Sequence, residues 1–163
     1  MSVRNCQELG VNFQLIIKRL LANQNLLKLL YYTDKNPLAK SDLTDLQIEK
    51  EVYEKLIRIT PRMLPQDNAQ SHIGLRIQNG IPNGENDEFR LVHFDFEIFT
   101  PMTQWMIVNT NLRPFAIMGE IENSLKGKRV KGLGVIKGNG FSAEFFSDEM
   151  TCYKLSFTLE IYD

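Results

Sequence analysis

The sequence predicts an α+β fold, in which N-terminal helices are followed by an antiparallel β-sheet with one short helix packed on it. Apolar residues recur at spacings of three and four over residues 13–30, which is the period of a helix. Residues 153–162 alternate strictly between apolar and polar, as a half-buried strand does. A proline-started amphipathic stretch near 113–125 lies between two strand-like regions. The 163 residues suit a single domain, mainly helical over 1–60 and mainly β over 70–163.

The helical half begins with an amphipathic pattern. Its apolar positions are Phe13, Ile16, Ile17, Leu20, Leu21, Leu26, Leu27, Leu29 and Leu30. Asn23-Gln-Asn25 is placed to break the pattern into two helices, and Asn36-Pro37 stops it. The capping residues Ser41-Asp42 and Thr44-Asp45 then predict a second helical stretch that runs through Ile57.

A long β-hairpin is expected next. Residues 72–78 alternate, residues 79–87 are a polar loop rich in Gly, Pro and Asn, and residues 89–99 form a second strand. Thr100-Pro101 ends this strand, and we expect an irregular connection up to Asn111.

The last fifty residues predict a helix and three more strands. Pro114 suits the first turn of a helix whose apolar stripe is Phe115, Met118, Ile121 and Leu125. Strand-like residues 130–137 and 141–146 flank Gly138-Asn139-Gly140, which predicts a tight turn between them. The final strand places one set of side chains on its packed face: Tyr153, Leu155, Phe157, Leu159 and Ile161.

Composition excludes several classes of protein. There are 19 basic and 20 acidic residues, and a net charge of -1 provides no global field that would attract DNA, RNA or an anionic membrane. Cys6 and Cys152 lie at opposite ends without CxxC spacing, which predicts free thiols in a reducing cytoplasm. Because no apolar run suits a signal peptide or a bilayer span, we expect a cytoplasmic protein that makes no membrane contact.

One strand carries the best candidate for catalysis. His93, Asp95 and Glu97 project from one face of it, so an imidazole and two carboxylates stand in a row that a metal-dependent hydrolase would use. The alternative is an ordinary strand, in which these three residues form the solvated face and the buried face consists of Val92, Phe94, Phe96 and Ile98. Since a metal site needs a further ligand and no nucleophile motif is present, the sequence favours a protein without catalytic residues, metal or cofactor.

Basic residues concentrate in the glycine-rich segment 127–140. They are Lys126, Lys128, Arg129, Lys131 and Lys137. The segment lacks the GK[ST] ending of a P-loop, but such a basic hairpin can contact phosphate or an acidic protein surface. A nucleic-acid-binding module would add stacking by Phe141, Phe145 and Phe146, whereas a merely solvated hairpin would be balanced by Glu120, Glu122 and Glu144.

Aromatic residues provide further candidate contacts. Trp105, the only tryptophan, lies among Met102 and Met106, and either anchors an interface or plugs the core beneath its loop. Tyr31 and Tyr32 end a core-facing helix and suit a subunit boundary.

The order of these elements resembles the tail terminator and neck proteins of tailed bacteriophages. The segments that carry the resemblance are Leu26 to Tyr32, Asn36-Pro37-Leu38, Leu112-Arg113-Pro114-Phe115, Ile117 to Leu125, Gly132-Leu-Gly134 and Tyr153 to Phe157. The resemblance covers most of the chain from residue 26.

The resemblance implies a non-catalytic virion protein of the tail or neck, assembled in the host cytoplasm. It implies a homohexameric ring that caps the tail tube, joins it to the head-tail connector or neck proteins, and surrounds the genomic DNA that passes through a lumen lined by sheet elements. Loop residues Asn83 and Glu85, together with the basic hairpin that carries Lys128, Arg129, Lys131 and Lys137, are then candidate contacts.

Overall fold

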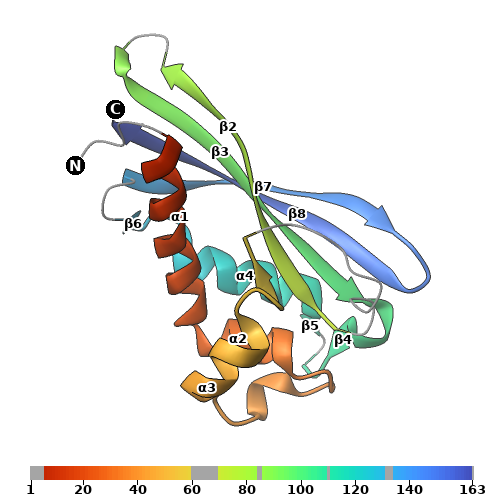
Figure 1. Cartoon of the computed structure of the whole chain (residues 1–163). Coiled ribbons are helices and arrows are strands. Elements are labelled where there is room, and N and C mark those ends of the chain that lie inside the picture. The colour runs from red at the N-terminus through yellow and green to blue at the C-terminus, as the bar shows by residue number, and fades with distance from the viewer. Residues whose placement is uncertain (1–5, 60–69, 84–85, 110, 131–133, 163) are drawn as a thin grey trace.

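A computed structural model describes residues 6–59, 70–83, 86–109, 111–130 and 134–162 of the chain (Figure 1). The helices are α1 (Cys6–Leu21), α2 (Gln24–Tyr31), α3 (Asp45–Gln47) and α4 (Arg113–Leu125), with shorter turns η1 (Pro37–Ala39), η2 (Ile48–Val52) and η4 (Met102–Gln104). The strands are β1 (Ile57–Arg58), β2 (His72–Asn83), β3 (Asn86–Pro101), β4 (Met106–Ile107), β5 (Asn111–Leu112), β6 (Arg129–Val130), β7 (Gly134–Phe146) and β8 (Met150–Tyr162).

Six of these strands form one twisted sheet in the order β1-β2-β3-β8-β7-β6. Only the short β1 runs parallel to its neighbour, and the other pairs are antiparallel. Helices α1, α2 and α4 pack on one face, which we call the inner face, and leave the other, the outer face, uncovered by helices (Figure 1). The predicted α+β class, with one short helix packed on an antiparallel sheet, is confirmed.

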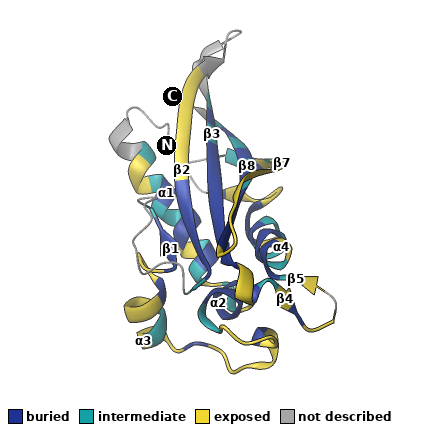
Figure 2. Cartoon of the chain, turned by 90° about the vertical axis from the view of Figure 1, so that its right-hand side faces the viewer, coloured by how far each residue is buried: buried dark blue, intermediate teal, exposed yellow. Residues whose placement is uncertain are grey.

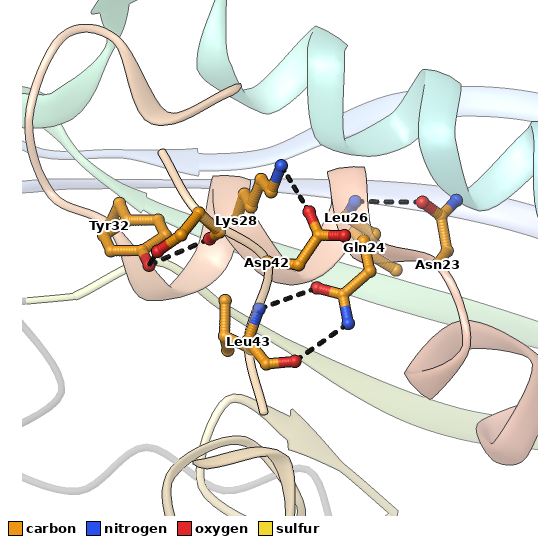
Figure 3. A network of polar contacts seen from close by, with 8 residues as sticks. Asn23, Gln24, Leu26, Lys28, Tyr32, Asp42 and Leu43 are labelled. Atoms are coloured by element: carbon orange, nitrogen blue, oxygen red, sulfur yellow. Dashed lines mark hydrogen bonds and ion pairs between the residues drawn. The ribbon is translucent and has the colours of Figure 1, made fainter. Parts of the chain in front are cut away.

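The two N-terminal helices are separated where the sequence predicted a break. Asn23 caps α2 by accepting a hydrogen bond from the backbone N–H of Leu26 at 3.1 Å. Gln24 exchanges two hydrogen bonds with the backbone of Leu43, and Lys28 forms an ion pair of 2.6 Å with Asp42 (Figure 3). These contacts tie the extended segment before α3 to the side of α2.

The predicted helix through Ile57 is wrong beyond Val52. Thr44 and Gln47 form the expected capping box, but α3 is one turn long and continues only as the π-helical turn η2. Glu54 then adopts a left-handed backbone conformation with φ 61°, which a helix cannot contain. The chain turns there, and Ile57 lies in β1.

The predicted loop 79–87 is much shorter than expected. Strand β2 continues to Asn83 and β3 begins at Asn86, so the polar segment belongs mostly to the hairpin ladder. A register shift between Ile77 and Asn79 accommodates one extra residue as a β-bulge.

Gly138-Asn139-Gly140 is a bulge, and the predicted tight turn there is wrong. Strand β7 runs through these residues, with a register shift between Gly138 and Gly140 against β8. Gly140 has φ 91°, which glycine adopts without strain. The chain reverses later, where the Ser147 hydroxyl accepts from the backbone N–H of Met150 at 3.0 Å.

Buried apolar side chains form one main core between the helices and the inner face. Phe13 of α1 meets Phe94 of β3 edge-on, with ring centroids 5.1 Å apart, and Phe94 stacks on Phe157 of β8 at 5.5 Å. The predicted apolar alternation of β8 is confirmed at Tyr153, Leu155, Phe157 and Leu159, which are all buried.

Helix α4 departs from its predicted stripe at one position. Met118, Ile121 and Leu125 are buried as expected, but Phe115 is 37% exposed. The connection before α4, predicted to be irregular, holds η4 and the small two-stranded sheet of β4 and β5.

Candidate assembly interface

Strand β7 leaves one edge of the sheet open. It pairs with β8 from Ile136 to Phe146, whereas on its other side the described residues bond to it only from Gly134 to Ile136, through β6 and the turn at Gly127 and Lys128. Residues 139–146 are all exposed, on both faces of the strand. An exposed edge strand presents backbone N–H and C=O groups that can pair with another chain.

Five aromatic rings gather beside this edge, and we call them the aromatic cluster: Trp105, Phe115, Phe141, Phe146 and Tyr153. Tyr153 is central, with its ring centroid 5.3 Å from that of Phe115, 5.6 Å from Phe146, 6.1 Å from Phe141 and 6.3 Å from Trp105. Phe141 and Phe146 are each 57% exposed. Large aromatic residues that gather at a surface are typical of protein interfaces.

Trp105 lies partly in the core and partly at the surface, and its role as an interface anchor stays a prediction. It is half-buried, it packs against Tyr153, and its indole N–H donates to the Thr151 hydroxyl at 2.8 Å. Because it borders Met102 and Met106, which are 42% and 69% exposed, it joins the aromatic cluster to a further apolar surface.

The opposite edge of the sheet is open as well. Strand β1 pairs with β2 only at Ile73 and Gly74, and from Leu75 onward β3 is the only strand among the described residues that pairs with β2. Residues 76–81 are exposed, as the yellow part of β2 in Figure 2 shows. Two isoleucines, Ile77 and Ile81, are 40% and 51% exposed on this edge.

The two open edges have complementary directions. Three antiparallel pairings separate β2 from β7, so these two strands run in opposite directions. When a second copy is placed beside the first, its β2 meets β7 of the first copy as an antiparallel neighbour. Sequential addition of copies therefore continues the alternation of the sheet.

The two open stretches lie at different heights along the strands. The open part of β7 begins after Ile136, whose backbone N–H and C=O bond to Lys128 and Gly127, and the open part of β2 reaches beyond the level of Ile136 at the other end of the sheet. Pairing over their full lengths requires the copies to be staggered along the strand direction. A sheet that closes on itself requires such a stagger between neighbouring strands.

The outer face of the sheet is polar over its middle, whereas Phe99, Phe145 and Cys152 form an apolar group near one end of it. Arg76 pairs with Glu97 at 2.8 Å, and Lys154 pairs with Glu144 at 3.0 Å. Lys137 lies on the same face because it pairs with Thr158, whose hydroxyl contacts His93 Nδ1 at 3.1 Å. Charges of both signs thus cover this face.

Two of the predicted solvated residues on this face are in fact buried. Asp95 and Glu97 are 5% and 8% exposed, because longer polar side chains of neighbouring strands cover them. The Gln78 amide donates to Asp95, and burial raises the pKa of Glu97, while the charge of Arg76 opposes that rise. Within the described part of the chain, no three His, Cys, Asp or Glu side chains are grouped so as to hold a metal ion.

Cys152 is a free, buried thiol, as predicted, and burial raises its pKa to about 12. It packs with Phe99 and Met150 in a small second cluster. The side chain of Cys6 lies outside the described residues.

The remaining predicted contacts are dispersed. The rings of Tyr31 and Tyr32 pack edge to face at the end of α2, on the helical side, with centroids 5.1 Å apart. The Tyr32 hydroxyl donates a hydrogen bond to the backbone carbonyl of Ser41. Asn83 pairs with Asn86 at the tip of the hairpin, but its side chain is outside the described part, as are Glu85 and Lys131.

The basic residues do not form one patch on a hairpin tip. Lys128 and Arg129 lie near the end of α4, next to Arg19 of α1, whereas Lys137 is on the outer face of the sheet. From the sequence, Phe141 and Phe146 were predicted only as stacking partners for nucleic-acid bases. No sequence pattern predicts that they pack around Tyr153.

Comparison with known proteins gives one family. Residues 23–159 match the YomW family, and no curated protein matches the chain. Among the described residues, no helix is long and apolar enough to cross a membrane. The match covers most of the chain, from the turn before α2 to the end of the sheet, and the chain therefore belongs to the YomW family, which is phage-derived.

Proposed function

We propose that this protein is a structural virion subunit of a tailed phage that assembles edge to edge into a ring at the end of the tail. In this role it is a tail terminator or neck subunit, which caps the tail tube and joins it to the head connector. The membership in a phage-derived family supports the phage origin that this proposal assumes.

The observation that carries the proposal is a sheet with two open edges of opposite strand direction. A monomer normally protects its edge strands by charge, proline, twist or cover. Although both edge strands contain bulges, β7 carries the exposed Phe141 and Phe146, and β2 carries the exposed Ile77 and Ile81. A head-to-tail contact between β7 and the β2 of the next copy buries both apolar edges and repeats around a closed ring.

The polar outer face suits a lumen through which DNA moves. Its paired charges, Arg76 with Glu97 and Lys154 with Glu144, hold no large excess of positive charge that would bind the phosphate backbone tightly. DNA can then slide past without being held. The helices face outward in this arrangement, toward the neighbouring neck proteins.

The mass of the assembly is the first test. Light scattering of the purified protein, alone and with tail-tube protein, is expected to give a species several times heavier than the 18.9 kDa monomer. A hexamer, which the resemblance implies, would be six times that mass. A strict monomer under both conditions would rule out the ring.

A pair of edge variants tests the head-to-tail contact itself. Phe141→Lys with Phe146→Lys blocks the β7 edge, and Ile77→Lys with Ile81→Lys blocks the β2 edge. Each variant alone is expected to be monomeric. Mixed together, they should form a one-to-one dimer, because each supplies the edge that the other lacks.

The matched control is Leu46→Lys with Glu49→Gln, which adds the same two units of positive charge at exposed positions of α3 and η2, away from both edges. This control is expected to assemble like the unchanged protein. If the two edge variants do not pair when mixed, or if the control blocks assembly equally, the proposed contact is wrong.

A further inference from the structure

A basic hollow lies on the helical side of the molecule, where the turn between α1 and α2 meets the end of α4 and the start of β6. It has a volume of about 560 Å³ and seven lining residues. Three of these residues are cationic, namely Arg19, Lys128 and Arg129, and none is acidic. We call these three residues the basic triad.

The triad is assembled by the fold from distant parts of the chain. Arg19 lies in the last turn of α1, and its Nη2 donates to the backbone carbonyl of Arg129 at 2.6 Å, across 110 positions of sequence. This bond holds the guanidinium at the hollow and leaves its other N–H donors available. Lys128 and Arg129 are exposed, so their side chains are free to reorient toward a ligand.

The charges of the triad are not neutralised by the protein itself. Across the described residues, no carboxylate forms an ion pair with any of the three. Other lysines do have carboxylate partners. Lys126 pairs with Glu122 at 3.9 Å, and Lys28 pairs with Asp42. Like charges that share one hollow repel each other, and a bound anion relieves this repulsion.

Helix ends and the nearest carboxylate do not cancel this charge. Glu120 is hydrogen-bonded to the Asn23 side-chain amide at 3.0 Å, and it does not line the hollow. The end of α1 contributes about half a negative charge beside the hollow. The end of α4 contributes only about half a negative charge.

We propose that the basic triad binds a phosphate group. Two guanidinium forks and one ammonium match the several oxygens of a phosphate, for which arginine provides paired hydrogen bonds. Asn123 and Ser124 also line the hollow and add polar groups to its wall. The hollow is open and larger than one phosphate, so it admits a phosphate that belongs to a nucleotide or to a nucleic-acid backbone.

This inference does not depend on the ring. The triad lies on the helical side, and although Arg129 is in β6, which pairs with the start of β7, no triad residue belongs to the open stretches 139–146 and 76–81. Loss of phosphate binding and loss of assembly can therefore be observed separately.

The test uses calorimetric titration of the full chain with three probes: inorganic phosphate, pyrophosphate and a short DNA duplex. The variant Lys128→Gln with Arg129→Gln removes two charges of the triad but keeps the carbonyl that accepts from Arg19. It is expected to bind each phosphate probe that the unchanged protein binds at least about tenfold more weakly. The control, Lys35→Gln with Lys50→Gln, makes the same change in net charge at exposed positions elsewhere and should bind normally.

Binding of pyrophosphate without DNA would support the triad as a site for a free phosphate or nucleotide, and binding of both would support a nucleic-acid contact. The proposal is overturned if none of the three probes binds at millimolar concentration. It is equally overturned if the control variant weakens binding as much as the triad variant. Circular dichroism of each variant verifies that the fold is retained.

Discussion

Arg113 is a buried cation whose hydrogen bonds join three parts of the helical side. Its side chain is fully buried at the start of α4. The guanidinium donates to the carbonyls of Leu29 and Tyr32 at the end of α2, at 2.6 and 2.8 Å, and to those of Gln104 and Asp34 at 2.9 and 2.6 Å. Burial lowers the pKa of Arg113, and the charge of Asp34 opposes that shift.

Replacement of this residue is expected to destabilise the protein strongly. Arg113→Met keeps much of the side-chain volume but leaves four carbonyl groups without their donor. Because an unsatisfied buried polar group is costly, we expect a loss of about 3 kcal/mol or more in the free energy of unfolding. Urea unfolding followed by circular dichroism measures this loss.

The comparison for Arg113→Met is Arg129→Met, which makes the same substitution at an exposed position. It should change stability by no more than about 0.5 kcal/mol. Similar losses in the two variants would mean that the hydrogen bonds of Arg113 contribute little.

Glu97 makes stability depend on pH in a definite direction. Burial raises its pKa above the ordinary value of 4.5, and Arg76 only partly opposes this. The native state therefore holds the proton more tightly than the unfolded chain does. The stability that this group contributes is fully present below the unfolded pKa, and it is lost as the pH rises through the native pKa.

Glu97→Gln, which resembles the protonated carboxyl group, is accordingly expected to be at least as stable as the unchanged protein at neutral pH. The difference in melting temperature should disappear when the pH falls below about 4.5. Thermal unfolding at a series of pH values measures this difference in melting temperature. The control is Glu49→Gln, which removes an exposed carboxylate. A variant that is less stable at neutral pH would show that the ion pair with Arg76 outweighs burial.

At the scale of elements, two glycines differ in whether their position requires glycine. Gly134 begins β7 with φ 76°, and a Cβ atom there would overlap the carbonyl oxygen of Glu160 on β8. Gly119 lies within α4, and a Cβ atom there would meet no atom within 4 Å.

Alanine substitutions at these two positions should act in opposite directions. Gly134→Ala is expected to lower the free energy of unfolding by about 2 kcal/mol or more, because it combines an unfavourable φ with a clash against backbone. Gly119→Ala should raise it by about 0.5 to 1 kcal/mol through helix propensity. Urea unfolding of both variants measures the contrast, and equal effects would contradict the assigned start of β7.

Local sequence signals located most elements but misplaced several boundaries. Gly138-Asn139-Gly140 has the composition of a turn, yet pairing with β8 on both sides turns it into a bulge. The polar run 79–87 resembles a loop, yet it belongs mostly to a long hairpin because β3 provides a partner for it. In both places the ladder, which is a non-local contact, overrides the local preference.

At the scale of the whole molecule, one main core connects the helices with the sheet. Phe13 of α1, Leu30 of α2 and Phe157 of β8 belong to the same buried cluster, although they are distant in sequence. The predicted single domain should therefore unfold in one step.

This prediction compares two signals during urea unfolding. Far-ultraviolet circular dichroism reports mainly on the helices, and fluorescence reports on Trp105, which lies beside the sheet. The two transitions are expected to coincide. Separate midpoints would mean that residues 1–60 and 70–163 unfold as distinct units.

The sequence by itself determined the fold class, the break at Asn23, the start of α4 and the packed face of β8, because helical and strand periods are local properties of the chain. It could not determine which strands lie at the edges of the sheet, that Phe141 and Phe146 gather around Tyr153, or that Arg19 meets Arg129. Those features depend on contacts between residues far apart in sequence, and only the tertiary structure decides them. The proposed interface and the basic triad both arise at that level, since each is formed by side chains from separate elements.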